Sequence, residues 1–448
     1  MTVTSQTPAG TTRTTRTTST SGQAAGLGGW LSATADAVRR TAERPLTSYY
    51  LLLGSTTMLL AIGLMMVLSA SSVYSYLQHG SSYFIFLKQL TWVIIGLPAA
   101  YLASRLNRRL LRFLAWPAVG VSFGLLALTQ TGLGFAVNGN RNWLALGPFT
   151  MQPSEIAKLS IILWAADVYA KKEKLLGNPW QALFPVAPVV AVIAGLVVFE
   201  HDLGTALVLF AILVGMLWVV GVPARLFGIV ISLVSVVAFY LAASNAERRT
   251  RLTSFIDPFK DFQGAGWQAG HGLLGMSSGG IFGKGLSASQ QKWGNLPEAH
   301  TDFIFAVLGE ELGLVGTLLV LALFGALAYG AIRLALNTED PFVRYVSAGV
   351  VIWLMSQMII NIGMVLALLP VIGIPLPLVS YGGSALVPSL VGLGLLVGFA
   401  RKEPEAAAAL QDRRSRSRKS PTQPGAISAG SPRSRNPRSS GRRTPGRG

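Results

Sequence analysis

Lys292-Trp-Gly-Asn-Leu-Pro-Glu-Ala-His-Thr-Asp-Phe-Ile-Phe-Ala-Val-Leu-Gly-Glu-Glu-Leu-Gly313 leads directly into an apolar run that continues to residue 335. Five titratable side chains stand where the apolar run begins: Glu298, His300, Asp302, Glu310 and Glu311. Only 12% of the chain is charged, and carboxylates at or inside a bilayer are costly. The stretch therefore predicts a functional site at the mouth of a membrane-spanning helix.

The composition indicates a membrane protein. The chain has 448 residues, of which 51% are hydrophobic, its mean hydropathy is +0.50, and several apolar runs exceed 18 residues. These values predict an all-α polytopic membrane protein. The absence of cysteine excludes disulfides, thiolate catalysis and cysteine metal sites. The four histidines are too scattered to form a metal signature.

Ten apolar runs have the length of a membrane span, about 20 residues each. They lie near 48–71, 83–103, 110–131, 154–170, 181–199, 203–220, 225–243, 303–335, 343–369 and 376–400. The eighth is long enough to be tilted or to extend past the bilayer. A large loop, 244–302, separates the seventh span from the eighth. The sequence thus divides into an N-terminal segment, 1–46, a ten-helix domain, 47–401, and a C-terminal tail, 402–448.

The positive charges orient these spans. Connections assigned to the inside carry Arg105, Arg108, Arg109 and Arg112, then Lys171, Lys172 and Lys174, then Arg225, Arg333 and Arg344, whereas the outer connections 72–82 and 200–202 carry no Lys or Arg. Cytoplasmic connections are enriched in these residues, so both termini are predicted to be cytoplasmic. Every unusual polar cluster then lies in or beside the outer loops 132–153, 200–202, 244–302 and 370–375. We therefore expect an extracytoplasmic active face.

The two tails are basic. Residues 401–448 hold thirteen Lys/Arg against three acids, and residues 1–46 hold five against two. Both segments are predicted to be disordered, apart from a short helix at 27–44 that is either interfacial or an ordinary connector. The C-terminal tail contains no interleaved aromatics, which argues against nucleic acid. Contact with anionic lipid or docking of a cytoplasmic partner both remain open.

A first polar cluster precedes and enters the fourth span. Arg141 and Trp143 offer a cation and an aromatic platform for a sugar or lipid headgroup. Ser154 is interpreted as a helix cap. Glu155 and Lys158 are three residues apart and share a helix face. They form either a self-neutralised pair or a cation facing a water-filled cavity, and the residues alone favour neither.

Two further clusters have structural alternatives. Asp202 and Thr205 have the spacing of a helix cap, which is favoured over catalysis on the residues alone. Asp302 is either a cap or a carboxylate base at a cavity mouth whose pKa is tuned by partial desolvation. Glu310 and Glu311 either line that cavity or tie helices together.

Two outer segments have unusual backbone composition. Nine of the 22 residues from Gly264 to Gly285 are glycine, yet Gly283-Lys284 is followed by glycine, so the loop is not a phosphate-binding Walker loop. The glycines predict tight packing over a groove with Trp267 and Trp293 as walls. The segment 370–384 is rich in proline and glycine, which breaks a helix at membrane depth. Such a break fits a transporter as well as an enzyme.

Three motifs together resemble the SEDS family of shape, elongation, division and sporulation proteins. They are KWGNLPEAHTDFIFAVLGEELG at 292–313, QPSEIAKLS at 152–160 and PLPLVSYGGSALV at 375–387. The resemblance covers most of residues 50–400. The sequence at 291–293 and 297–300 is more similar to the division branch of the family than to its elongation branch.

The resemblance implies a peptidoglycan glycosyltransferase of the cell membrane that polymerises lipid II at the division septum. It implies that Asp302 is the catalytic base and that Trp143, Glu155, Lys158, Asp202 and Thr205 serve the substrate. Lys158 is the first candidate to face the leaving pyrophosphate, with Arg141 and Lys292 behind it, and His300 is a further substrate-binding candidate. Two departures stand out: Asn142 separates Arg141 from Trp143, and His201 replaces the family's proline before Asp202.

The resemblance also bears on partners and cofactors. It implies a class B penicillin-binding protein as transpeptidase partner, with other division proteins reached through the tails. No cofactor is required by the sequence and no residues are assigned to a metal, although Mg²⁺ or Mn²⁺ beside the pyrophosphate stays open. The main alternatives are a lipid II flippase, which would move headgroups without making polymer, and a non-catalytic scaffold.

Overall fold

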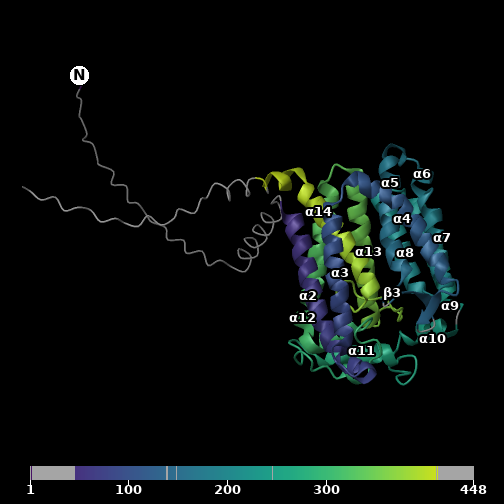
Figure 1. Ribbon diagram of the computed structural model, residues 1–448, viewed down its shortest axis with the longest axis vertical. Coiled ribbons are helices and arrows are strands. Elements are labelled where there is room, and N and C mark those ends of the chain that lie inside the picture. The colour runs from purple at the N-terminus through teal and green to yellow at the C-terminus, as the bar shows by residue number, and fades with distance from the viewer. Residues whose placement is uncertain are drawn as a thin grey trace, which may run out of the picture.

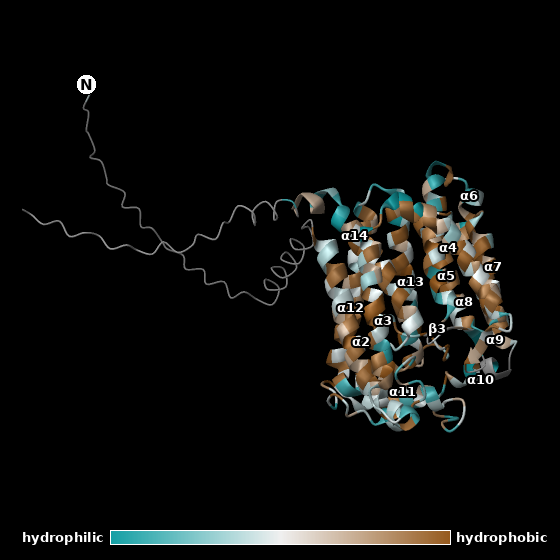
Figure 2. Cartoon of the chain, viewed as in Figure 1, coloured by the Kyte–Doolittle hydropathy of each residue, from teal (hydrophilic) through white to brown (hydrophobic). Residues whose placement is uncertain are grey.

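The computed structural model describes residues 2, 46–137, 140–147, 149–244, 246–409 and 411. The interfacial helix expected at 27–44 and nearly all of both tails lie outside these residues. The described chain forms one bundle of long helices that run roughly side by side (Figure 1). Figure 2 shows apolar residues along the middle of the helices and polar residues gathered toward the two ends of the bundle. This is the architecture of a polytopic membrane protein.

Among the described residues, nine helical segments are long and apolar enough to cross a membrane. They are α2 (Thr47–His79), α3 (Phe84–Arg105), α4 (Arg108–Thr129), the pair α6 (Pro179–Leu183) and α7 (Val186–Phe199) taken together, α8 (Leu203–Val220), α9 (Ala224–Ala243), α12 (Ile304–Asn337), α13 (Pro341–Val365) and α14 (Gly383–Lys402). The expected fourth span, 154–170, corresponds to α5 (Pro153–Lys171), a buried helix within the bundle that is not among these nine. Its four charged residues make it more polar than the other nine.

Small residues allow the closest helix contacts. Helix α14 runs along α3 (Figure 1), and a Cβ at Gly394 or Gly398 would overlap the backbone of Ala100 or Ser104. Gly63 of α2 likewise lies against the backbone of Leu378. Because lipid supplies no hydrophobic drive between helices, such close backbone packing is a main source of helix association in membranes.

The expectation of an all-α chain is wrong at one place. Residues 134–151 form a three-stranded antiparallel sheet of β1 (Gly134–Val137), β2 (Asn140–Leu146) and β3 (Phe149–Met151), in the order β1-β2-β3. Phe135 pairs with Trp143, and Ala145 pairs with Thr150. The strands have three to seven residues, too short for the alternation of polar and apolar residues to stand out in the sequence.

The large loop is folded rather than extended. It contains α10 (Ala246–Ser254), α11 (Trp267–Ser278) and the 3-10 turn η2 (Gln291–Trp293). The loop also inserts where α12 is broken at Gly313, whose φ of 66° and ψ of −163° are not helical. There Lys284 N donates to Glu310 O at 3.0 Å, and Leu314 N donates to Gly280 O at 3.0 Å. The loop thus replaces helical hydrogen bonds that the break removes.

The last helix begins later than its hydropathy suggests. The sequence places the tenth span at 376–400, whereas α14 begins at Gly383 and residues 370–382 are irregular. Gln89 of α3 supports this irregular backbone, since its Nε2 donates to Ser380 O and its Oε1 accepts from Gly382 N, both at 3.3 Å. Irregular backbone at such depth needs partners of this kind within the protein.

Candidate active site

Asp302 lies in the turn just before α12, and its backbone is held from two directions. Asn361 of α13 donates from Nδ2 to the carbonyl oxygens of Asp302 and Ile374, each at 2.7 Å. Ser380 donates from Oγ to Thr301 O at 2.6 Å. The turn is therefore fixed by α13 and by the irregular segment 370–382, which explains why the proline- and glycine-rich motif accompanies the acidic one.

The side chain of Asp302 does not cap the helix that follows it. The cap position of α12 is Phe303, so the alternative of Asp302 as a helix cap is wrong. Within the described residues no hydrogen-bond donor reaches its side chain. The group is half-buried, and a Cβ at Gly373 would stand 3.4 Å from its Oδ2. Burial first, then the charges of Glu298 and Asp202, raise the pKa of Asp302 to about 7.

Asp202 is bound on every side. Its Oδ1 accepts from Thr205 N at 2.9 Å, which confirms the predicted cap at the start of α8. Its Oδ2 accepts from Thr205 Oγ1 at 2.8 Å, from Gln152 Nε2 at 2.8 Å and from Asn142 Nδ2 at 3.0 Å. Asp202 therefore joins the sheet, the start of α5 and the start of α8 at one point.

The two aspartates lie in the same region. Their link runs through the irregular segment, because a Cβ at Gly204 would stand 3.0 Å from Ile372 Cγ2 and 3.1 Å from Ile372 O. The next residue, Gly373, is the one beside Asp302. The influence of Asp202 on the pKa of Asp302 reflects the same proximity. Residues separated by a hundred positions thus line one site.

Both departures from the family pattern have a structural counterpart. The inserted Asn142 is buried and donates to Asp202, a role that sequence reasoning missed. His201 has a φ of 65°, which a proline ring cannot adopt because it fixes φ near −65°. The chain therefore enters α8 by a local path that differs from one with proline at this position.

Arg141 and Trp143 lie on β2 at the surface of the sheet. The Nε of Arg141 donates to Gly134 O at 3.2 Å, and one terminal nitrogen donates to Thr131 O at 2.6 Å. The side chain of Arg141 is exposed, and that of Trp143 is half-buried. Arg141 thus braces the hairpin while part of its guanidinium remains open to solvent.

Lys158 and Glu155 form an enclosed ion pair on α5. The distance from Lys158 Nζ to Glu155 Oε2 is 2.7 Å, and the side chains are 0% and 4% exposed. Nζ also lies 5.6 Å from the ring centre of Trp353. In this conformation the pair is self-neutralised. The helix begins at Pro153, and Ser154 makes no cap bond, so the predicted cap at Ser154 is wrong; proline at the first position already starts the helix.

His300, a candidate for binding the substrate, is packed between two tyrosines. Its ring stacks on Tyr74 at a centroid distance of 5.3 Å and tilts against Tyr381 at 5.6 Å. Burial lowers the pKa of His300, and the neighbouring charge of Glu298 partly opposes this. Glu298 in turn accepts from Thr301 Oγ1 at 2.6 Å, which keeps the turn before Asp302 compact.

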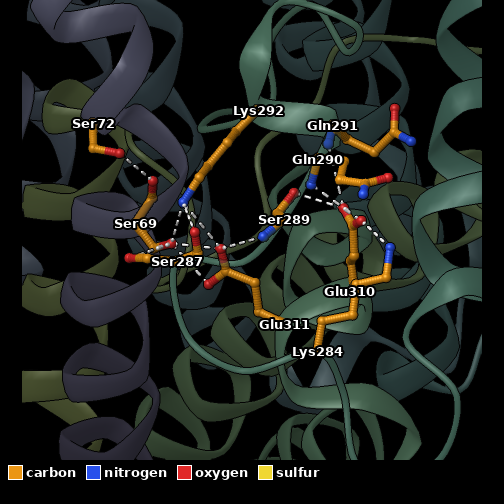
Figure 3. A network of polar contacts seen from close by, with 10 residues as sticks. All are labelled: Ser69, Ser72, Lys284, Ser287, Ser289, Gln290, Gln291, Lys292, Glu310 and Glu311. Carbon is orange, nitrogen blue, oxygen red and sulfur yellow. Dashed lines mark hydrogen bonds and ion pairs between the residues drawn. The ribbon is translucent and has the colours of Figure 1, made fainter.

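Glu310 and Glu311 fasten the large loop, residues 244–302, to α12 (Figure 3). Glu310 pairs with Lys284 Nζ at 2.8 Å and accepts from Ser289 Oγ at 2.6 Å. Glu311 accepts from Ser69 Oγ of α2 at 2.6 Å and lies 3.5 Å from Lys292 Nζ. Lys292 is itself buried. Both glutamates therefore serve as anchors, the structural alternative for this pair.

Glu200 is a buried acid that sequence reasoning did not single out. It follows α7 directly and is fully buried, and Thr129 Oγ1 donates to one of its carboxyl oxygens. Burial raises the pKa of Glu200 to about 7; the Thr129 bond opposes the rise and Asp202 adds to it. The sequence signal that could have identified Glu200 as a site residue was its position two residues before Asp202.

The described residues contain no group of three or more His, Cys, Asp or Glu side chains placed to hold a metal ion. Both carboxylate oxygens of Asp202 already accept hydrogen bonds from the protein. Few lone pairs remain to coordinate a cation. The donor set at this site therefore does not fit a resident metal.

The chain resembles known proteins over most of its length. The model of a family described as "Cell cycle protein" (FtsW, RodA and SpoVE) matches residues 50–405. A probable peptidoglycan glycosyltransferase FtsW of Mycobacterium tuberculosis is 40% identical over 369 residues, 82% of this chain and 70% of that protein. Stage V sporulation protein E of Bacillus subtilis is 36% identical over 348 residues, 77% of this chain and 95% of that protein.

Two solved structures share the fold. One belongs to a study of how a peptidoglycan synthase complex coordinates polymerization and crosslinking; it has a TM-score of 0.63 and 30% identity, and covers 78% of this chain and 96% of its own. The other is the rod shape determining protein RodA of Thermus thermophilus, with a TM-score of 0.58 and 31% identity, covering 79% of this chain and 97% of its own.

Proposed function

Because the chain belongs to the cell cycle protein family of FtsW, RodA and SpoVE, we propose that it is a peptidoglycan glycosyltransferase that polymerises lipid II. The observation that carries the assignment is the carboxylate of Asp302. Asp202, Glu310 and Glu311 are occupied by protein donors, whereas Asp302 is half-buried, receives no donor from the described residues and has a pKa of about 7. A general base works best with a pKa near the operating pH.

The reaction joins two lipid-linked disaccharides. The 4-hydroxyl oxygen of one glucosamine unit attacks the anomeric carbon of the other substrate, and its proton passes to Asp302. The bond from the anomeric carbon to the pyrophosphate oxygen breaks, undecaprenyl pyrophosphate leaves, and inversion gives a β-1,4 linkage. General-base help of this kind contributes about 10²–10⁴ in rate. Positioning of the two substrates supplies much of the remainder.

The leaving pyrophosphate needs a cation, and three side chains are candidates. The charges of Lys158 and Lys292 are compensated by Glu155 and Glu311, so either would have to leave its partner. Arg141 is exposed on the sheet and bound there to backbone oxygens. The geometry therefore favours Arg141 for the pyrophosphate and Trp143 for the sugar. Lys158 is instead assigned a structural role, the ion pair with Glu155 within α5.

No step of this reaction is routed through Mg²⁺ or Mn²⁺, because the donor set does not fit a resident metal. A cation carried by the pyrophosphate of the substrate remains compatible with the site. Addition of a chelator to the polymerisation assay separates the cases: a rate unchanged by chelation supports protein cations alone, and a rate restored by Mg²⁺ or Mn²⁺ assigns the ion to the substrate.

The finer topology belongs to the same proposal. Ten spans, with α5 as the fourth, place both termini in the cytoplasm and Asp302 outside, where lipid-linked sugars are presented. The enzyme would act at the division septum with a class B penicillin-binding protein that crosslinks the new strand. The basic C-terminal tail would contact anionic lipid or other division proteins, so a chain that ends at residue 401 should keep its polymerase activity in vitro.

The experiment places purified full-length chain in vesicles with fluorescent lipid II. A polymerase gives glycan strands that an endoglycosidase digests, with or without headgroup translocation. Translocation of the headgroup without polymer would establish the flippase alternative. If neither polymer nor translocation is seen with the transpeptidase partner present, the remaining function is that of a non-catalytic scaffold. Lys174→Gln is a suitable control variant, because Lys174 is exposed on the predicted cytoplasmic side.

A further inference from the structure

A cleft lies at the end of the bundle opposite Asp302. Its volume is about 510 Å³, and it opens between the first turns of α4 and the last turn of α5. Arg108 of α4 pairs with Asp340 at the start of α13, while Asn361 of α13 bonds the backbone of Asp302. The 21 residues between those two contacts correspond to about 30 Å of helix, so the cleft and the active site face opposite membrane surfaces.

Three cations line this cleft around one buried anion. Asp167 is fully buried and accepts from Arg112 Nε at 2.6 Å, from Lys171 Nζ at 2.6 Å and from Trp116 Nε1 at 2.9 Å. Arg109 is the third cation. One carboxylate cannot neutralise three cations, so the lining keeps a surplus of positive charge.

The buried aspartate also orients the cations. Long basic side chains at a membrane edge usually extend freely toward water, whereas these are held in place. Lys171 Nζ lies 5.4 Å from the ring centre of Trp116, and the Arg112 guanidinium lies 5.8 Å from that of Phe342. Their side chains are still 53% and 37% exposed. The arrangement presents fixed positive charge to whatever enters the cleft.

Unused donors face the same space. Arg112 donates to Asp167 through its Nε only. Its terminal nitrogens have no partner in the described part of the chain. Arg109 is exposed and makes no ion pair there either. Guanidinium groups with free terminal nitrogens suit phosphate oxygens, which they bind in a two-pronged geometry.

The aromatic residues of the cleft define the kind of ligand. Phe113 is 73% exposed and Trp116 is 50% exposed, and both lie within the first three turns of α4, where an apolar side chain meets the edge of a bilayer. A free phosphate gains nothing from such neighbours, whereas a phospholipid places acyl chains beside its headgroup. Basic pockets between helix ends bind anionic headgroups in this way.

We propose that this cleft binds the phosphodiester headgroup of an anionic glycerophospholipid. Arg109 and Arg112 hold the phosphate, Lys171 adds charge, and Phe113 with Trp116 contacts the start of the acyl chains. The leaflet is the cytoplasmic one if the topology proposed above holds. Binding itself depends on neither that topology nor the polymerase activity.

Native mass spectrometry of the full chain, with lipid added back after delipidation, tests the proposal. The wild type should retain phosphatidylglycerol in preference to phosphatidylcholine. Arg109→Gln should weaken phosphatidylglycerol binding about fivefold, and Arg109→Glu should weaken it further, since a cation near the surface contributes about that factor. Lys174→Gln is the matched control, because it removes one charge from the same end outside the cleft and should leave binding unchanged.

Several outcomes would overturn the proposal. They are equal retention of phosphatidylcholine, an equal effect of Arg109→Gln and Lys174→Gln, displacement of the lipid by inorganic phosphate at equal concentration, and preferential binding of a polyprenyl pyrophosphate. The readout is lipid retention, so an inactive polymerase would not affect it. Conversely, loss of the lipid site would leave the assignment of Asp302 intact.

Discussion

The raised pKa of Asp302 should make the catalytic carboxylate a source of instability. An Asp302→Asn variant keeps the shape of the side chain and removes its titration. The pKa of Asp302 rises from 3.8 to about 7 on folding, chiefly because burial disfavours the charged form. A carboxyl group shifted in this direction supports folding at low pH, and that support is lost as the pH rises through the folded pKa.

The size of the effect follows from the shift. Each pKa unit corresponds to about 1.4 kcal/mol, so an upper bound for the cost of ionising Asp302 in the folded state is about 4 kcal/mol. The group retains some solvent contact, which reduces the expected value to about 2–3 kcal/mol. Relative to the wild type, Asp302→Asn should therefore be about as stable at pH 4.5 and more stable at pH 8.

Thermal unfolding of the detergent-solubilised chain measures this difference. We expect Asp302→Asn to raise the Tm at pH 8 by about 2–5 °C and to change it little at pH 4.5. Asp202→Asn is the matched control. It sets an amide against the donors from Asn142, Gln152 and Thr205, so it should lower the Tm at both pH values. If Asp302→Asn shifts the Tm equally at pH 4.5 and pH 8, or lowers it at pH 8, the reasoning is refuted.

Three further predictions concern the ion pair on α5, the anchor of the large loop and the glycine beside Asp302. Lys158→Met alone should cost about 3–5 kcal/mol because it strands Glu155, whereas Met at both positions should be nearly neutral in thermal unfolding; equal losses would contradict an enclosed pair. Glu310→Gln should speed amide exchange at residues 284–291 more than Lys284→Met does, since Glu310 also holds Ser289; unchanged exchange would exclude the anchoring role. Gly373→Ala should lower both Tm and polymerisation rate, because φ there is +79° and such a backbone strains alanine by about 1–2 kcal/mol; a wild-type rate would show that the segment tolerates the change.

Long apolar runs were the part of the fold most open to prediction. The run at 203–220 coincides with α8, Leu203–Val220, because lipid requires about 20 apolar residues, and Asp202 and Gly221 cap its two ends. Hydropathy wrongly predicted a helix at 376–382. This segment is as apolar as a membrane helix, but its prolines prevent the helical backbone. The sheet at 134–151 was missed because its strands are too short for their periodicity to register.

The sequence singled out Asp202 and Asp302 as candidate site residues, but it did not indicate the contacts that surround them. Titratable residues in outer loops pointed to Asp202 and Asp302, but the contact between Gly373 and Asp302 joins segments about 70 positions apart. Nothing local to Asn142 indicates that it binds Asp202. The partners of Glu310 and Glu311 likewise come from a loop whose path depends on the break at Gly313, a tertiary feature.

The most direct test of Asp302 as general base is the polymerisation rate of Asp302→Asn on lipid II, measured beside the wild type across pH 5 to 9. The wild-type rate should rise with pH and level off above about pH 7, because only the ionised carboxylate accepts the proton. Asp302→Asn should be slower by at least about a hundredfold at pH 8 while unfolding no earlier than the wild type. A folded Asp302→Asn enzyme with wild-type rate at pH 8 would contradict the assignment.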